Sequence, residues 1–364
     1  MPVIFSYQDL FRFTKQIFIE VGCNDNNAKE ATATLLSADL RGIDSHGVAR
    51  LSGYIRLWEK GRINMKANFK IVHETPSTAT IDADEGLGLI AGGFAMNIAL
   101  NKAKNVGTGW VAVKGSNHFG IAARHAMMAL EHNMIGIAMT NASPLVAPTH
   151  STKRMLGTNP MAFAIPAKNE PAFVADFATT TAANGKLEIL QRKNLSAPNG
   201  WIQDQNGNNS FNPNELSKGG ALLPLGGDRE HGSHKGFCLG AVVDIFSAVL
   251  SGANYGPWVP PFVAFLEPPA NPVGSGIGHF FGAMRVDAFR PAEDFLSNMD
   301  NWIKAFREAP SIEGQPNVVI PGDPERIAEA ERTINGIPII DKVVEDLILL
   351  GEKMNITFPQ PISV

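Results

Sequence analysis

Residues 109–140, GWVAVKGSNHFGIAARHAMMALEHNMIGIAMT, place two short β-rich runs, GWVAV and MIGIAMT, on either side of a segment with helical spacing at 121–131. Similar β-rich runs occur upstream, FKIVH and TATID, and downstream, MAFAIP. A second helical segment is expected at 89–105. This alternation of short strands and helices predicts a mixed α/β fold for the middle of the chain.

Both ends of the chain are predicted to be helical. Ser6 and Asp9 resemble a capping box that opens the first helix. The expected terminal helices cover 7–21, 27–40, a stretch after Gly42 that includes Val48 to Trp58, a stretch from the N-cap Asp323 and Pro324 to Gly336, and 341–353. We expect 1–75 and 322–364 to pack as one helical lobe beside a central α/β domain at 76–321. Gly-, Pro- and Asn-rich stretches at 194–227 and 254–278 are expected to be loops.

The composition favours a protein that binds a small molecule. With 364 residues, 44% of them hydrophobic, the chain can form two well-packed domains. A net charge of -4 disfavours nucleic acid and an anionic membrane as partners. Cys23 and Cys238 are too few for a disulfide framework, and the N-terminus lacks the pattern of an export signal, so we expect a cytoplasmic location. The apolar segment 237–250 is too short to span a bilayer.

Gly86–Ala91 matches the pattern G-x-G-x-x-A, which opens the phosphate-binding turn of a Rossmann domain. That turn needs an acidic residue about 20 positions later, and none occurs between Glu85 and Glu131. We therefore expect a glycine-rich turn before a packed helix, and a fold that is not a Rossmann fold. The same stretch favours an anionic ligand, unless its lysines only cover a solvated helix face. Its cations are Lys102, Lys104, Lys114, His118, Arg124 and His125.

Residues 41–57, RGIDSHGVARLSGYIRL, carry the first group of candidate catalytic side chains. On a continuous helix, His46, Arg50 and Tyr54 would share the face opposite the core stripe. A histidine that titrates near neutrality can accept a proton, and a guanidinium can bind a carboxylate through two hydrogen bonds. The alternative is a surface helix whose histidine and arginine have no functional role.

A second group of candidates follows strand-like runs further along the chain. His118, in GSNHFG, is expected at the carboxyl end of a strand, where open α/β sheets bind ligands, although Asn117 or Ser116 could simply cap the next helix. Asp176 ends the run AFVAD before three threonines. Lys235, in GSHKG, is expected at the start of a helix, where pyrophosphate binds well. Either of the last two motifs could be no more than a capped turn.

Other chemistries have weaker support. A hydrolase triad could be assembled from Ser45, His46 and Asp176, but no G-x-S-x-G elbow occurs. His231-x-x-His234 lies in a glycine-rich loop and lacks the spacing of a helical zinc site, so no metal is expected. A non-enzymatic binding protein would also have a pocket, and turnover of a nicotinamide cofactor would separate it from an enzyme.

Six motifs in order, RGIDSHGVARL, GSNHFGIAARHA, LGTNPMAFAIP, VADFATTTAANGK, HKGF and GIGHFFGAMR, resemble the type-2 malate/L-lactate dehydrogenase family. The resemblance runs almost from end to end. It implies a homodimeric oxidoreductase with a non-Rossmann nicotinamide-binding fold, which interconverts a small 2-hydroxy acid and its 2-keto acid. It implies NAD, with NADP as the alternative. Malate and oxaloacetate are the favoured pair. Lactate, sulfolactate and ureidoglycolate dehydrogenases and cyclic imine reductases of the family remain open.

The resemblance also assigns site residues. His118 and His46 are the two candidates for acid/base catalysis, and we favour His118. Arg50 is the implied carboxylate ligand. Tyr54, on the same predicted helix face, is also assigned to the substrate, as are Ser45 and Asn117, which precede the two histidines in their motifs. The implied cofactor-binding residues are Asp176, Phe177, Ala178, Thr179, His234, Lys235, Gly322 and Asp323. Ser233, Cys238 and Asp244 depart from the usual residues of the family and leave the shape of the phosphate loop open.

Overall fold

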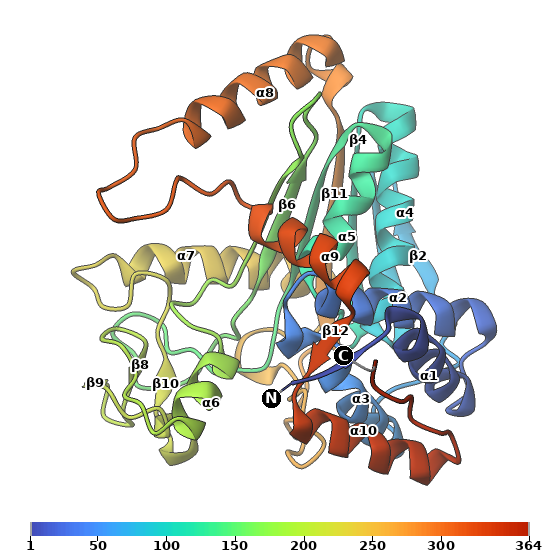
Figure 1. Cartoon of the computed structure of the whole chain (residues 1–364), viewed down its shortest axis with the longest axis vertical. Coiled ribbons are helices and arrows are strands. Elements are labelled where there is room, and N and C mark those ends of the chain that lie inside the picture. Colours follow the sequence, from blue (N-terminus) through green and yellow to red (C-terminus); the bar gives the residue numbers. More distant parts are fainter. Residues whose placement is uncertain (1, 363–364) are drawn as a thin grey trace.

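A computed structural model describes residues 2–362, and its centre is a seven-stranded sheet in the order β2-β3-β4-β11-β5-β6-β7 (Figure 1). Its strands are β2 (Lys70–Glu74), β3 (Thr78–Gly86), β4 (Thr108–Ser116), β5 (Met134–Thr140), β6 (Met161–Ile165), β7 (Phe173–Phe177) and β11 (Ile277–Arg285). Only β3 and β4 pair in parallel, and the other neighbours in this sheet are antiparallel. The predicted mixed α/β class is confirmed.

Helices cover both faces of this sheet. On one face, α4 (Gly88–Val106) and α5 (Ala122–Ala126) pack many alanines against Phe281 of β11. On the other face, Val243 of α7 (Ser233–Asp244) packs against Phe280, and a π-helical turn, Ile245–Val249, continues α7. Neighbouring side chains of a strand point to opposite faces, so β11 contributes to both cores. Its position between β4 and β5 was not expected from sequence order.

The two ends of the chain share a second core. The helices α1 (Tyr7–Glu20), α2 (Asp25–Leu40), α3 (Leu51–Glu59) and α10 (Asp341–Met354) gather there, and β1 (Val3–Phe5) pairs antiparallel with β12 (Ile337–Ile339). The termini lie close together in Figure 1. The Ser6 side chain accepts the Asp9 N–H at 3.0 Å, so the predicted cap of the first helix is confirmed. The domain boundaries proposed at 75 and 322 stay a prediction.

Three predicted helix starts or spans are wrong in detail. The segment after Gly42 forms two 3₁₀ turns, Asp44–His46 and Val48–Arg50, before α3 begins, because Gly47 adopts an extended ψ of -146°. The helix expected over 121–131 becomes a 3₁₀ segment after Ala126. In α9 (Asp323–Asn335), the N-cap is Gly322 with φ +98°, so Asp323 is the first helical residue and not the cap.

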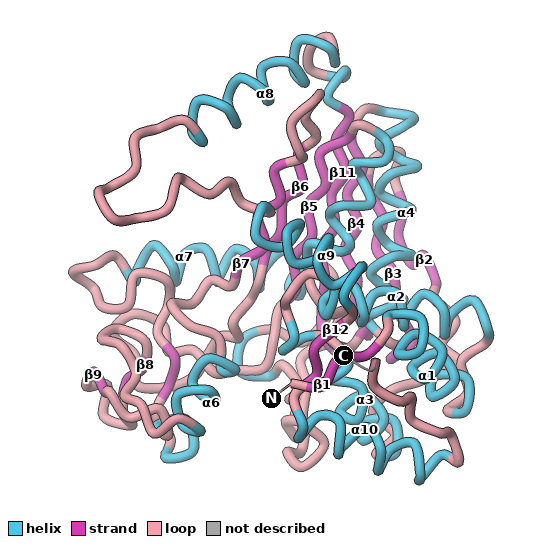
Figure 2. Tube along the Cα trace, viewed as in Figure 1, coloured by secondary structure: helices cyan, strands magenta, loops and turns pink. Residues whose placement is uncertain are grey.

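The stretches expected to be loops are mostly irregular, as Figure 2 shows, but they contain some regular structure. The first holds the small sheet of β8 (Ile202–Gln203), β9 (Asn209–Ser210) and β10 (Ala221–Leu222), which lies beside α6 (Asn184–Arg192). The helix α8 (Ala292–Arg307), at the top of Figure 1, is not predicted by the sequence. Its Trp302 packs against Phe173 of β7, with ring centroids 5.7 Å apart. A long segment leads from α8 to α9.

Candidate active site

His118 lies in the loop between β4 and α5, at the carboxyl end of the strand as the sequence predicted. The Tyr54 hydroxyl lies 2.7 Å from its Nδ1, and the Gly120 N–H donates to the same nitrogen at 3.3 Å. The ring of Phe262 stacks on the imidazole with centroids 4.4 Å apart. These contacts hold the imidazole in place through Nδ1 and one ring face, and none of the three uses Nε2.

The hydrogen bonds at Nδ1 of His118 bear on which of its two nitrogens can take a proton. When Nδ1 carries the hydrogen, it donates to the Tyr54 oxygen, and the lone pair of Nε2 is free to accept a proton. The Gly120 N–H can only donate, so it favours the opposite tautomer. The phenol oxygen can accept from Nδ1–H or donate to an unprotonated Nδ1, and its contact of 2.7 Å is the shorter of the two. The base-competent form is the one in which Tyr54 accepts from Nδ1–H.

His46 lies beside His118, with ring centroids 5.6 Å apart and an interplanar angle of 27°. Its Nδ1 is 2.9 Å from the Ser45 hydroxyl, and Arg50 Nε donates to the Ser45 carbonyl at 2.7 Å. Arg50 therefore keeps its two terminal nitrogens for a ligand. His46, Arg50 and Tyr54, which were expected on one helix face, do lie near His118. Two 3₁₀ turns and the start of α3 carry them there in place of one continuous helix.

The two histidines are poor proton acceptors compared with a free imidazole. Burial, followed by the charge of Arg50, lowers the pKa of His46 to about 4. Burial, His46, Arg50 and His279 together hold the pKa of His118 well below its ordinary value. Both rings are therefore neutral near pH 7. The expectation of an acid/base group that titrates near pH 6.5 is wrong for the unliganded protein.

A buried carboxyl group supports the turn that carries His46. Asp39, near the end of α2, is 1% exposed, and its Oδ2 accepts the Val48 N–H at 2.8 Å. A Cβ on Gly47 would overlap this carboxyl, so glycine is required at that position. Burial raises the pKa of Asp39 to about 8. Asp39 was not predicted, because a lone aspartate inside a helix gives no signal of a backbone partner nine residues away.

A second buried support lies under the His118 loop. His279 of β11 is 0% exposed, and its Nε2 is 2.7 Å from the Ser116 hydroxyl while its Nδ1 is 2.8 Å from the Thr140 hydroxyl. Its ring also stacks on Phe119, with centroids 4.8 Å apart. Burial lowers its pKa to about 3, so it stays neutral. His279 lies in a motif that we recognised, but its pairing across three strands was not readable from sequence.

Asn117 anchors the same loop. Its amide donates to the backbone carbonyls of Glu85 at 2.9 Å and Gly86 at 3.2 Å, and its own backbone oxygen would overlap a Cβ on Gly88. The glycine-rich turn at 86–91 therefore lets α4 begin against the His118 loop, which agrees with the expected packing role. The N–H groups of the Asn117 side chain thus hold the loop in place.

The residues implied for cofactor binding fall into two groups. Asp176, at the end of β7, accepts the Ala123 N–H at 2.8 Å at the start of α5, and burial raises its pKa to about 6. Phe177 is exposed, Ala178 is half-buried, and the buried Thr179 hydroxyl donates to the carbonyls of Thr158 and Asn159. Asp176 therefore contacts the helix that follows His118, and this group adjoins the loop that carries His118.

Gly322 and Asp323, at the start of α9, lie near the beginning of β7. The Pro321 carbonyl accepts the Val174 N–H at 3.0 Å, which ties the start of α9 to β7. The Asp323 carboxylate is engaged with Arg307 and Arg326, which lower its pKa against the effect of burial. Asp323 therefore lies near β7 but faces arginines of its own chain.

His234 and Lys235 lie in the first turn of α7, where we expected Lys235. Arg229 donates to His234 Nδ1 at 2.9 Å, and Lys235 is exposed. The Leu225 N–H donates to the Thr179 carbonyl at 3.0 Å, which links the segment before this turn to the group at the end of β7.

Three cations of the stretch 102–125 already have acidic partners. Lys102 is buried and bonds Glu74 at 2.8 Å, Lys114 pairs with Asp82, and Arg124 lies 3.8 Å from Glu30. The acids come from distant segments, which explains why the local absence of carboxylates was misleading. Lys102 also does not cover a solvated face, because it is buried.

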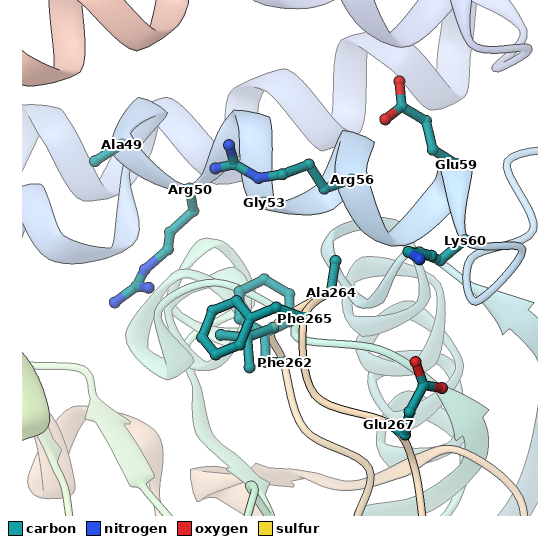
Figure 3. A pocket seen from close by; sticks show the side chains of 11 residues that line it. Ala49, Arg50, Gly53, Arg56, Glu59, Lys60, Phe262, Ala264, Phe265 and Glu267 are labelled. Atoms are coloured by element: carbon teal, nitrogen blue, oxygen red, sulfur yellow. The ribbon is translucent and has the colours of Figure 1, made fainter. Parts of the chain in front are cut away.

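A cavity of about 830 Å³ lies beside the His118 site, with Arg50 and Phe262 in its wall (Figure 3). Within residues 2–362, His, Cys, Asp and Glu side chains form no group of three or more that could hold a metal ion. The same residues contain no helix with the length and apolarity that crossing a bilayer demands. The geometry fits a small acidic ligand held by Arg50 beside His118.

Comparison with known proteins identifies the family. The profile of the malate/L-lactate dehydrogenase family matches residues 5–348. The chain belongs to this family. It is 41% identical to the malate dehydrogenase of Pyrococcus abyssi over 96% of this chain and 94% of that one. It is 36% identical to the malate/(S)-sulfolactate dehydrogenase of Methanothermus fervidus over 94% and 95% of the two chains. The crystal structure of malate dehydrogenase from Entamoeba histolytica superposes with a TM-score of 0.91 at 31% identity, over 99% of this chain and all of that one. The fold predicted from the resemblance is therefore confirmed, because the chain shares the fold of this family.

Proposed function

We propose that the protein is a nicotinamide-dependent dehydrogenase that interconverts L-malate and oxaloacetate. The observation that carries the proposal is that His46 and Tyr54 converge on His118, beside a cavity that has Arg50 and Phe262 in its wall. The names of the Pyrococcus abyssi and Entamoeba histolytica relatives favour malate among the 2-hydroxy acids of the family.

Each of these side chains has a distinct task in the oxidation. The terminal nitrogens of Arg50 bind the substrate carboxylate as a planar fork, since its Nε is already bonded to Ser45. Nε2 of His118 accepts the hydroxyl proton, while Tyr54 holds Nδ1. His46, neutral and beside His118, donates a hydrogen bond to a substrate oxygen. Phe262 covers one face of the His118 ring and limits the access of water.

A nicotinamide cofactor fits the residues next to this group, and when bound it supplies the hydride acceptor. Lys235 and the turn at the start of α7 offer a cation and a helix N-terminus, which suit a pyrophosphate. We assign Asp176, Phe177, Ala178 and Thr179 to the nicotinamide side of the cofactor. His234, Gly322 and Asp323 are the further residues proposed to contact it. We propose NAD, with NADP as the alternative.

The test is a turnover assay that follows the absorbance of the reduced nicotinamide. Malate, lactate, sulfolactate, ureidoglycolate and a cyclic imine are each offered with NAD and with NADP. Malate with NAD is expected to give the highest kcat/KM. Absence of turnover with every 2-hydroxy acid would refute the enzyme and favour a binding protein.

We further propose that the protein is a cytoplasmic homodimer. Cys23 and Cys238 are free thiols, which suits a reducing compartment. α7 and the π-helical turn after it expose a contiguous apolar stripe, which supports association with a second copy of the chain. The stripe consists of Leu239, Val242, Ile245, Phe246, Val249 and Leu250.

Light scattering on the purified protein tests the dimer. Leu250→Asp is expected to give monomers, because a charge on a buried apolar interface is costly. Ile334→Asp, on the exposed side of α9, is the matched control and should leave the mass unchanged. A monomeric mass for the unchanged protein would refute the proposal.

A further inference from the structure

The cavity beside Arg50 extends along α3, away from the reacting end of the site. It is bounded on one side by α3 and on the other by the loop at 262–267 (Figure 3). Phe262, which stacks on His118, belongs to its wall, so the cavity adjoins the imidazole. A substrate held by Arg50 therefore has space for a second functional group in the direction of Lys60.

The charges around this cavity favour an anion. The cations in its wall are Arg50, Arg56 and Lys60, and the acids are Glu59 and Glu267. Glu59 forms an ion pair with Lys353, which lies outside the wall. Glu267 lies close enough to Arg62, also outside the wall, to act on its pKa. Both acids are therefore partly neutralised from outside, and the cavity keeps an excess of positive charge.

Arg56 is the cation best placed to use this space. Its side chain runs back along α3, past Gly53 and toward Arg50 (Figure 3). Its ion pair with Asp346 is 3.5 Å long, and the two side chains are 58% and 40% exposed. An exposed pair of this length contributes little, so the guanidinium can turn to a ligand at small cost.

Gly53 keeps the space between the two arginines open. A Cβ built on Gly53 meets no atom within 4 Å, although the residue lies inside α3, in its first turn. Glycine weakens a helix interior relative to alanine, and here no close packing requires it. The absence of a side chain leaves room for a ligand between Arg50 and Arg56.

We propose that Arg56 binds the second carboxylate of a 2-hydroxy dicarboxylic acid, in the space over Gly53, while Arg50 binds the carboxylate next to the reacting carbon. This assignment rests on the proposed function and deepens it. A monocarboxylic acid such as lactate places only a methyl group in this space and makes no use of Arg56. Arg56 is thus the residue that selects dicarboxylic substrates.

The test compares kcat/KM for malate and for lactate in Arg56→Gln. Loss of one charged hydrogen-bonding partner should lower kcat/KM for malate about 10–100-fold and leave the value for lactate within about threefold. Arg12→Gln is the matched control, because it removes the same charge from an exposed side chain of α1 that lies outside the wall of this cavity. It should leave the malate-to-lactate ratio unchanged. An equal effect of Arg56→Gln on both acids, or no effect, would overturn the assignment.

Two further measurements keep the result decisive. Gly53→Leu should raise KM for malate more than for lactate, whereas Gly53→Ala, which also favours the helix, should change both less.

If the unchanged protein turns over neither acid, the proposed function fails, and calorimetric binding then tests the site alone. Arg56→Gln should weaken succinate binding about tenfold or more and leave propionate unchanged. Equal affinities of the two proteins for succinate would overturn the assignment.

Discussion

Replacing Tyr54 by phenylalanine removes one oxygen from the candidate site and leaves the packing in place. The ring of Tyr54 is fully buried and meets Phe262 edge-on, with centroids 5.1 Å apart. Phenylalanine keeps that ring contact. The lost oxygen is the one 2.7 Å from His118 Nδ1, and the Gly120 N–H, at 3.3 Å, then remains as the close neighbour of this nitrogen.

The expected effect follows from that geometry. Without the phenol oxygen, Nδ1–H has no acceptor, and Gly120 favours the tautomer with the hydrogen on Nε2, which cannot accept a proton. Because Tyr54 is buried, water does not readily replace its hydroxyl, and an unsatisfied buried donor costs about 1–3 kcal/mol. If this cost falls on the reacting form of His118, kcat for malate oxidation falls about 5–150-fold.

The assay is malate oxidation at saturating malate and cofactor, together with thermal unfolding and the Kd for reduced cofactor. KM and the cofactor Kd should change little. Tyr7→Phe, at the start of α1, is the matched control and should alter neither kcat nor stability. A Tyr54→Phe enzyme with kcat within about twofold of the unchanged protein would show that Tyr54 does not hold the base-competent tautomer.

Three further results are expected. His118→Asn should lower kcat about 10²–10⁴-fold, while His46→Asn should chiefly raise KM, and the reverse pattern would exchange the two roles. The unchanged protein should keep its rate from pH 8 down to 6.5 and lose it only at lower pH, because the pKa of His118 lies well below 6.5. Initial rates measured against pH check this. Arg50→Lys should weaken malate binding by about 1.5–3 kcal/mol and leave the cofactor Kd unchanged, as measured by calorimetry; equal losses would place Arg50 on the cofactor or in a structural role. Asp39 keeps its proton up to a pKa of about 8 in the folded protein but has an ordinary value of 3.8 when unfolded, so its contribution to stability is complete below about pH 4 and is lost as the pH rises through 8. Asp39→Asn should remove this loss, on the order of 1 kcal/mol per pH unit, in urea unfolding between pH 5 and 9, and parallel curves for the two proteins would refute the assignment.

Local sequence patterns predicted most of the regular elements. Apolar spacing located α1 and α4 to within a residue or two, and the Ser6 cap followed from side chains three residues apart. Each of these features depends on neighbours within one or two turns of the chain. The position of His118 at the end of β4 followed from the strand pattern alone. The reaction class followed from six motifs in a fixed order.

The tertiary structure decided what those motifs touch. The 3₁₀ turns at His46 replace a helix because Asp39 accepts the Val48 N–H across the end of α2, and periodicity does not encode that contact. Tyr54 and His118 are 64 residues apart in sequence and 2.7 Å apart in space. The acids that neutralise the cations of 102–125 also come from elsewhere in the chain. The sequence alone determined the element types and the residues available for chemistry, because those depend on local spacing. Their partners, their tautomers and their pKa values depend on burial and on long-range contacts, which exist only in the folded chain.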